Sequence, residues 1–273
     1  MNYELIRPMF EAFRANEGIA TGVVQWMLNA AWPKMYWQLY DWYLNPNGVF
    51  YGTKKACEPL QLIYKYSSRS VFLVNSTRRS IENLTAEIRI FDLHSNEIFN
   101  NRQTASTGPQ SSMEIFTLPD FPDITATYFL DIRLIEKDGS QIASNYYWLS
   151  TQSDVLDYQA QVDPWEYYTP SKQYADFTLL NSLSPTTVTL RREIQTNNNR
   201  LTVELENTGE SIAFAVKLDI INDKTGETIV PVFWQDNYIA LLPGERRTIN
   251  AEFNRDASNI KFNVQGWNAE TKS

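Results

Sequence analysis

The sequence predicts a mainly β protein in which two β-sandwiches follow a short α/β segment. The spacing of apolar residues changes near residue 60 from three or four to two. From there, β-branched and aromatic residues recur in short runs that polar turns separate, and the pattern pauses once at residues 156–184. We therefore divide the chain into residues 1–58, a sandwich at 59–155, a connection at 156–184 and a second sandwich at 185–273.

The first 58 residues predict a helix, a buried strand and further helices. The apolar residues of the first helix are spaced by three and four, as on one helix face: Leu5, Ile6, Met9, Phe10 and Phe13. Residues 19–28, "IATGVVQWML", are nearly all apolar and resemble a strand of a parallel sheet, buried on both faces. A helix is expected after Pro33, a turn at "NPNG", and a last short helix at "TKKACEPL".

The two predicted sandwiches rest on alternating apolar and polar residues. In the first, the runs are "QLIYKYS", "SVFLVNS", "LTAEIRIFDL", "SMEIFTL" and "TYFLDIRLIE". In the second, they are "TTVTLRREI", "RLTVELENTG", "SIAFAVKLDIIND", "RRTINAEF" and "IKFNVQGW". Gly139, Gly226 and Gly244 are expected in turns, and the polar connection allows one short helix at residues 174–183.

Composition and charge exclude some classes of function. The 273 residues carry 24 Lys and Arg against 32 Asp and Glu, and the formal net charge of −8 argues against nucleic-acid binding. No apolar stretch is long enough for a membrane span, and no signal peptide is evident. We therefore expect no nucleic-acid partner and no membrane partner.

The sequence contains no complete set of catalytic residues that can be recognised from their spacing. His94 is the only histidine and Cys57 the only cysteine, so neither a nucleophile–histidine relay nor a metal site can be assembled, and no cofactor is expected. Glycoside hydrolysis needs two carboxylates, but the spacing of Asp41 and Glu58 does not mark them as such a pair. Structural roles are expected for both.

Several long stretches resemble glycoside hydrolase family 2, most closely its exo-β-D-glucosaminidase branch, with β-mannosidases as near relatives. They are "ATGVVQWMLNAAWPKMYWQLYDWYLNPNGVFYGTKKACEPLQLIY", "SVFLVNS", "YWLSTQSDVLDY", "WEYYTP", "YADFTLLNSL" and "FWQDNYIALLPGE". The resemblance implies that the two sandwiches are immunoglobulin-like and that residues 1–58 form the C-terminal end of a catalytic (β/α)8 barrel. It implies a C-terminal portion of an enzyme that hydrolyses β-linked glucosamine from chitosan oligosaccharides. Neither catalytic carboxylate motif is present, so the isolated chain is expected to be inactive.

The resemblance also gives the aromatic segment a role, because active sites of such barrels lie at the C-terminal ends of the strands. Trp26 would stack on the terminal sugar, Asn29 would reach hydroxyls or the 2-amino group, and Trp32 would line the entrance. The alternative is that rings at helical spacing pack the closing helix against its neighbours: Tyr36, Trp37, Tyr40 and Tyr43.

Three hypotheses of function remain open at this point. The preferred one is the non-catalytic region just described, whose intact enzyme would take a β-linked amino-sugar or mannose oligosaccharide; a β-mannosidase fragment is its variant. The others are a carbohydrate-binding or structural accessory module, and a complete small enzyme of unknown type. We expect the orphaned barrel segment to pack on the first sandwich through Trp37, Tyr40 and Trp42, or to form a homodimer. The parent enzyme is expected to be periplasmic or secreted.

Overall fold

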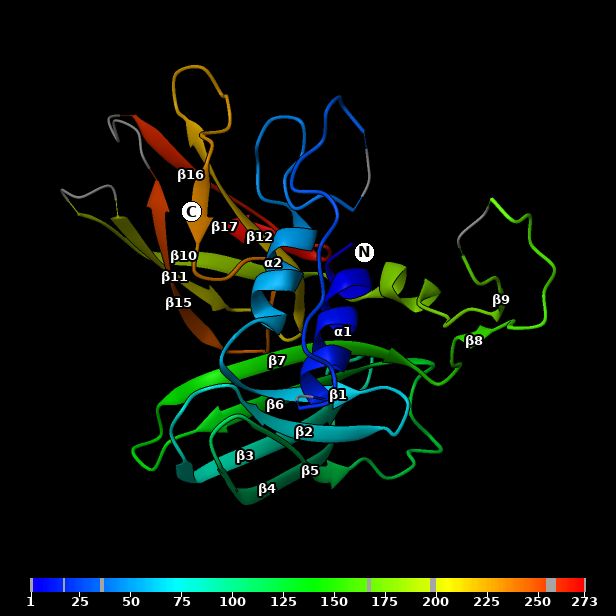
Figure 1. Ribbon diagram of the computed structural model, residues 1–273. Helices are drawn as coiled ribbons and strands as arrows, with labels where there is room; N and C mark the ends of the chain where they lie inside the picture. Colours follow the sequence, from blue (N-terminus) through cyan, green and yellow to red (C-terminus); the bar gives the residue numbers. More distant parts are fainter. Residues whose placement is uncertain are drawn as a thin grey trace.

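The computed structural model describes residues 2–16, 18–34, 37–165, 168–196, 200–253 and 259–272. Figure 1 shows two β-sandwiches with a pair of short helices placed between them, irregular loops above the helices, and an arm that projects to one side. The predicted fold class, mainly β with immunoglobulin-like sandwiches after a short N-terminal segment, is confirmed. Among the described residues, neither the length nor the apolar character of any helix suffices to cross a membrane.

The first sandwich consists of a three-stranded and a four-stranded sheet. The smaller sheet has the order β1-β2-β5, from β1 (Leu60–Lys65), β2 (Ser70–Asn75) and β5 (Ser111–Thr117). The larger has the order β4-β3-β6-β7, from β3 (Ile81–Phe91), β4 (Glu97–Thr107), β6 (Thr127–Ile135) and β7 (Gln141–Ser150). Alternate residues of β3 are buried from Leu84 to Ile90, which is the period of two that the sequence showed.

The second sandwich combines a five-stranded and a three-stranded sheet. The larger sheet has the order β13-β15-β11-β10-β17, from β10 (Thr186–Thr196), β11 (Arg200–Asn207), β13 (Val232–Trp234), β15 (Arg246–Phe253) and β17 (Ala269–Lys272). The smaller has the order β14-β12-β16, from β12 (Ala213–Asn222), β14 (Ile239–Leu241) and β16 (Ile260–Gln265). Gly139, Gly226 and Gly244 connect consecutive strands with positive φ, so their predicted turn positions are confirmed.

The two sandwiches share a mixed apolar and ionic interface. Phe129 of β6 and Phe214 of β12 lie 5.8 Å apart between ring centres, inside a buried cluster that residues from both sandwiches form. Beside this cluster, the Arg133 guanidinium contacts Asp131 at 2.8 Å and Glu245 at 2.9 Å. The sandwiches are therefore held by contacts between them as well as by the connecting chain.

Two helices join the N-terminal segment to both sandwiches. These are α1 (Asn2–Ala15), which contains Pro8, and α2 (Gly48–Ala56). The two helices pack so closely that a Cβ on Gly52 of α2 would lie 2.5 Å from the carbonyl oxygen of Tyr3 in α1. The expected turn at "NPNG" is partly wrong, because Asn47 caps α2 by accepting a hydrogen bond from the Val49 amide at 2.8 Å. The helix expected at "TKKACEPL" accordingly begins earlier and ends at Ala56.

Two predictions for the segment between these helices are wrong. Residues 19–28 are not a strand and residues 37–44 are not a helix; the described part of this segment forms irregular loops with isolated bridges at Asn29–Tyr40 and Tyr40–Pro46. A strand is stabilised by pairing with neighbouring strands, and the described residues of this segment form isolated bridges only. Helices this short are also marginal without packing. We refer to residues 18–47 as the loop segment.

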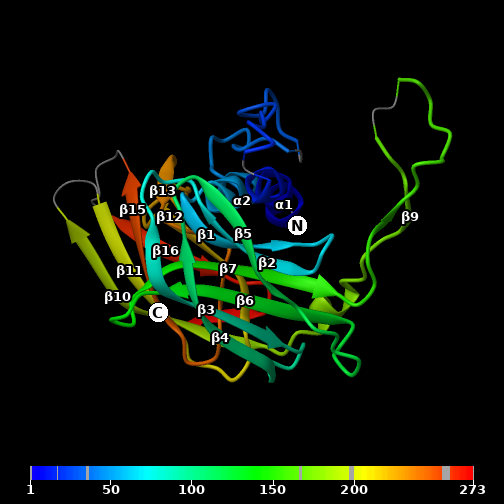
Figure 2. The ribbon, with the colours of Figure 1, turned by 60° about the horizontal axis from the view of Figure 1, so that its bottom comes forward.

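The connection between the sandwiches forms a long projecting hairpin, which we call the arm (residues 151–177). Its strands β8 (Val155–Leu156) and β9 (Ser171–Gln173) pair only with each other among the described strands. The short helix expected at residues 174–183 is present as a 3-10 helix, η1 (Thr178–Ser182). Figure 2 shows the arm rising on the same side of the molecule as the loop segment.

Candidate functional site

The three predicted sugar-binding residues all lie in the loop segment and face outward. Trp26 has 74% of its surface exposed, and Asn29 and Trp32 are exposed as well. The ammonium of Lys34 lies 4.5 Å from the centre of the Trp32 ring, a cation–π distance. Within the described residues, no hydrogen bond or ring contact joins the three side chains. They share one surface, but they do not form a closed pocket by themselves.

A few polar and aromatic contacts hold the loop segment in place. The Tyr40 amide donates to the carbonyl of Leu28 at 3.1 Å, and its ring lies 5.4 Å from that of Phe50 on α2. The Gln25 side chain donates to the Trp37 carbonyl at 2.8 Å. Packing on the first sandwich through Trp37, Tyr40 and Trp42 was therefore the wrong expectation, since Tyr40 contacts α2 while Trp37 and Trp42 are exposed. Tyr36 lies outside the described residues.

A buried charge cluster that sequence reasoning missed fixes α1 on the first sandwich. Arg7 is fully buried, and its guanidinium lies 3.9 Å from the centre of the Tyr147 ring. It donates to the Tyr146 carbonyl at 2.7 Å and pairs with Glu4 and Glu11, one turn away on either side. The spacing Glu4, Arg7, Glu11 places all three on one helix face, and this was the signal available in the sequence.

The electrostatics of this cluster depend on Glu11. Burial raises the pKa of Glu11 to about 7, although the Arg7 charge works in the opposite direction. The carboxylate accepts hydrogen bonds from the Tyr147 hydroxyl at 3.0 Å and the Asn145 amide at 3.1 Å. The three partners of the Glu11 carboxylate, Arg7, Asn145 and Tyr147, are all buried, so these contacts fix α1 on the sandwich. Glu4 and Glu11 also border the open groove described below.

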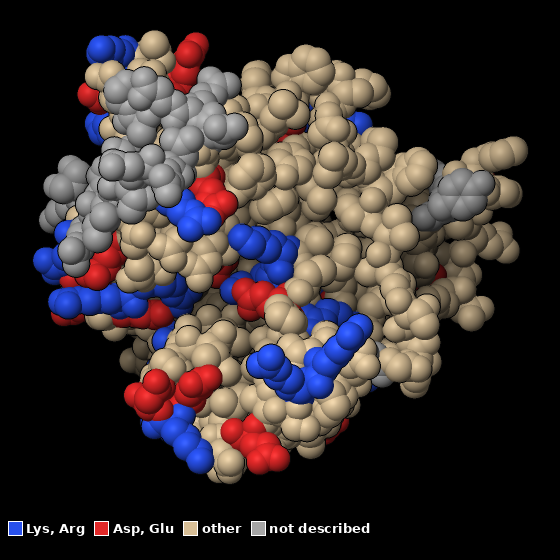
Figure 3. All heavy atoms as spheres, turned by 60° about the vertical axis from the view of Figure 1, so that its left-hand side comes forward, with Lys and Arg blue, Asp and Glu red and all other residues tan. Residues whose placement is uncertain are grey.

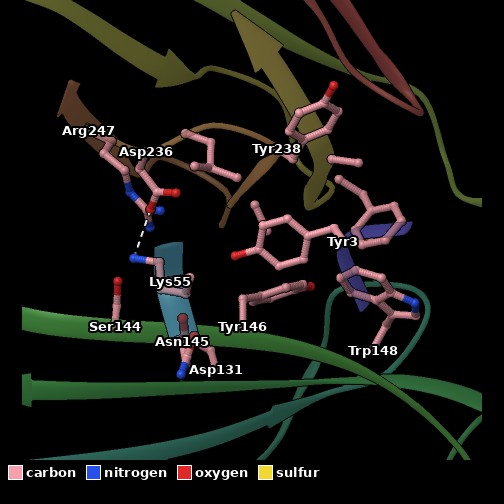
Figure 4. A pocket seen from close by; sticks show the side chains of 14 residues that line it. Tyr3, Lys55, Asp131, Ser144, Asn145, Tyr146, Trp148, Asp236, Tyr238 and Arg247 are labelled. Carbon is pink, nitrogen blue, oxygen red and sulfur yellow. Dashed lines mark ion pairs between the residues drawn. The ribbon is translucent and has the colours of Figure 1, made fainter. Parts of the chain in front are cut away.

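A second polar cluster lies where α2 meets both sandwiches (Figure 4). Lys55 contacts Asp236 at 2.9 Å, and its other partner is Glu58, also at 2.9 Å. Figure 4 shows the Tyr3 ring between the Lys55–Asp236 ion pair and the Trp148 ring. The remaining cavity measures about 30 Å³, enough for a water molecule but far below the size of a sugar.

An open groove lies between α1 and the base of the arm. It measures about 1100 Å³ and is lined by Leu5 and Pro8 of α1, by Tyr66 and Phe121 of the first sandwich, and by Phe177 at the end of the arm. Its walls are mixed apolar and polar, and they include the carboxylates of Glu4, Glu11 and Asp154. The groove is large enough for a segment of polypeptide.

The structure gives no sign of a catalytic role for Asp41, Glu58 or His94. Asp41 accepts hydrogen bonds from the amides of Tyr43 and Asn45, both at 2.9 Å, and so closes a turn. Glu58 pairs with Lys55, as expected for a structural role. His94 is exposed in the turn between β3 and β4. Within the described residues, no three His, Cys, Asp or Glu side chains gather in a way that could hold a metal ion.

Two protein-family models match separate parts of the chain. Residues 67–152 match the mannosidase Ig/CBM-like domain, and residues 166–269 match the exo-β-D-glucosaminidase Ig-fold domain. Together with the two sandwiches, these matches define the class: a protein with the immunoglobulin-like domains of glycosidases. More specifically, the chain carries the Ig-fold domains of the exo-β-D-glucosaminidase and mannosidase branch of glycoside hydrolase family 2.

Curated relatives extend this similarity over the whole chain. The exo-β-D-glucosaminidase of Amycolatopsis orientalis is 33% identical over 99% of this chain, and that of Streptomyces avermitilis is 34% identical over 97%. The chain covers only 27% of the first relative and 31% of the second. It therefore represents an exo-glycosidase-related region that spans about a third of the length of these relatives.

Solved structures agree with this assignment. The crystal structure of the Amycolatopsis orientalis exo-chitosanase CsxA matches with a TM-score of 0.89 at 32% identity, covering 98% of this chain and 33% of that chain. The same relative has been solved in complex with PNP-β-D-glucosamine. A β-D-mannosidase from Dictyoglomus thermophilum, at 17% identity and a TM-score of 0.70 over 99% of this chain and 29% of its own, shares the fold alone.

Proposed function

We propose that the chain is the non-catalytic C-terminal region of an exo-acting β-glycosidase that removes β-linked glucosamine from chitosan oligosaccharides. One observation carries this proposal: curated exo-β-D-glucosaminidases match nearly the whole chain at 33–34% identity, yet the chain covers about a third of them. The catalytic carboxylates would lie in the remaining two thirds. The structural surroundings of Asp41 and Glu58 support this division of roles.

In this proposal the loop segment borders the sugar pocket of the intact enzyme. Residues 1–58 would complete a barrel whose active site lies at the C-terminal ends of its strands. Trp26 would stack on the terminal sugar, Asn29 would bind its polar groups, and Trp32 would line the entrance. Their outward orientation supports this assignment, because each side chain is available to a ligand that the missing part of the barrel holds.

The proposal is tested by assaying the purified chain on p-nitrophenyl β-D-glucosaminide. We expect no release of nitrophenol, because two correctly placed carboxylates are needed for glycoside hydrolysis. The result that contradicts the proposal is turnover that survives purification and disappears when an Asp or Glu of this chain is replaced by its amide.

A β-mannosidase region is the second candidate function, and the match of residues 67–152 to a mannosidase domain favours it. The two candidates differ in the substrate that an enzyme containing this chain hydrolyses, β-D-glucosaminide or β-D-mannoside. A carbohydrate-binding module has less support, because the exposed Trp and Tyr rings gather on the loop segment and the arm and not on a sandwich face.

A further inference from the structure

The groove between α1 and the base of the arm is lined by more acidic than basic side chains. The acidic residues belong to α1, to the connection from β5 to β6 and to the arm: Glu4, Glu11, Asp120 and Asp154. Two basic residues, Lys65 and Arg69, also line it, and Arg69 is already paired with Asp120. Even when the buried Arg7 is added to them, the acidic groups exceed the basic ones. The groove therefore favours a cationic ligand over a neutral or anionic one.

One carboxylate oxygen at this groove is buried without a partner. The Glu11 side chain is 1% exposed, and its Oε1 atom accepts the hydrogen bonds from Tyr147 and Asn145. Its Oε2 atom is buried and has no hydrogen-bond partner within the described residues. Such an oxygen is costly and calls for an ion, a water molecule or a ligand. Because Glu11 also lines the groove, a cation that enters there would compensate its charge.

The arm contributes a second carboxylate on the other side of the groove. Asp154 is exposed, and its Oδ1 atom accepts a hydrogen bond from the Ala175 amide at 2.8 Å. In the part of the chain that the structure describes, no Lys or Arg pairs with it. An ammonium group in the groove could therefore form a charge-assisted hydrogen bond with Asp154.

Aromatic rings line the groove between these carboxylates. Tyr66 is 42% exposed and its hydroxyl donates to Glu4, while Phe121 and Phe177 are partly buried. Rings of this kind offer apolar faces that also attract cations. Small-molecule sites usually measure about 300–1000 Å³, so a groove of about 1100 Å³ has room for a short oligosaccharide.

The groove is separate from the sugar pocket considered above, because none of Trp26, Asn29 and Trp32 lines it. Acidic side chains elsewhere are mixed with basic ones on the face that Figure 3 shows, where red and blue atoms lie side by side over the sandwiches. That face therefore offers no acidic surface comparable to the groove.

We propose that the groove is a second binding site, for a β-linked glucosamine oligomer whose ammonium groups pair with Glu11 and Asp154 and whose rings pack on Tyr66. The choice of glucosamine rests on the function proposed above; the acidic and aromatic lining by itself indicates a sugar chain that carries ammonium groups. A site of this kind would hold the substrate polymer on the enzyme at a distance from the catalytic pocket.

The test is calorimetric titration of the chain with a β-linked glucosamine trimer at about pH 7 and low salt. We expect one trimer to bind per chain. Cellotriose has the same rings with hydroxyls in place of the amino groups, and it should bind at least about tenfold more weakly. Added salt should weaken the binding of the glucosamine trimer because it screens the charges.

Two pairs of variants locate the site. Leu5→Arg adds a cation to the groove lining and Asp154→Asn removes a charge from it, and each should raise the Kd at least about fivefold. Met9→Arg is the control for the first, because Met9 is also exposed on α1 but does not line the groove. Asp138→Asn is the control for the second, since the exposed Asp138 likewise accepts a main-chain amide, that of Ser140 at 2.9 Å. Neither control should change the Kd. Equal thermal unfolding shows that all four variants are folded.

Four outcomes overturn the inference. The first is no binding of the trimer, which would leave Glu11 with water alone. The second is equal binding of cellotriose, and the third is equal binding of trilysine, which would make the groove a site for cationic peptides. The fourth is a Kd that neither Leu5→Arg nor Asp154→Asn changes.

Failure of this inference is distinguishable from failure of the proposed function. If the trimer does not bind but an enzyme containing this chain hydrolyses β-D-glucosaminide, the second site is refuted and the proposed function stands. Hydrolysis by the isolated chain would refute the proposed function, whether or not the groove binds the trimer.

Discussion

Replacing Arg7 with methionine is expected to release α1 from the first sandwich. The guanidinium is fully buried, contacts the Tyr147 ring face at 3.9 Å and donates to a main-chain carbonyl at 2.7 Å. Methionine preserves much of the side-chain volume but leaves Glu4 and Glu11 without their buried cation. Removing one partner of a buried ion pair costs about 3–5 kcal/mol, whereas an exposed pair contributes about 1 kcal/mol or less.

The assay is limited proteolysis under native conditions, at a pH of about 8 where the carboxylate of Glu11 is ionised. Because about 1.4 kcal/mol corresponds to a factor of ten, cleavage within residues 1–58 should accelerate by roughly two to three orders of magnitude. The matched control is Arg102→Met, which removes an exposed pair with Glu87 at 3.4 Å. Equal cleavage rates in the two variants would refute the role of the buried cluster in holding α1.

Three further predictions concern the same scaffold. Because burial raises the pKa of Glu11 to about 7 from 4.5, the stability due to its protonated form is complete below pH 4.5 and is lost as the pH rises through 7. The pH-dependent part of the free energy of unfolding amounts to at most about 3 kcal/mol. Glu11→Gln should remove it, so that the rate of proteolysis changes less with pH. Gly52→Ala should lower the free energy of unfolding by about 1–3 kcal/mol in urea titrations, whereas Gly22→Ala, which meets nothing within 4 Å, should have little effect. Arg133→Met should separate the unfolding of the two sandwiches into two calorimetric transitions, and a single unshifted transition would contradict this.

The sandwiches could be predicted from the sequence because each strand shows the alternation of apolar and polar residues within its own length. Leu84 to Ile90 alternate between core and surface within one strand, and β3 finds its partners inside the same domain. Residues 19–28 carry an equally apolar pattern, yet no strand forms there. A local pattern cannot reveal whether distant neighbours are present to pair with a strand.

The candidate site was predictable only in part. The sequence placed Trp26, Asn29 and Trp32 on one segment, and the structure exposes all three on it. It could not show whether they converge, because a local pattern does not reveal which distant groups lie around them. The Arg7 cluster was missed for a different reason: its charged residues resemble a solvated helix face, and it is tertiary contacts, with the Tyr147 and Trp148 rings, that bury Arg7.

The central claim, that this chain is an exo-β-D-glucosaminidase region lacking its own catalytic groups, is tested most directly with a chimera. In it, this chain replaces the matching third of the Amycolatopsis orientalis enzyme, and hydrolysis of p-nitrophenyl β-D-glucosaminide is measured beside the isolated chain. The account predicts that the chimera is active, that the isolated chain is inactive, and that Trp26→Ala in the chimera lowers kcat/KM at least tenfold. A folded chimera without activity, or an active isolated chain, would contradict the account.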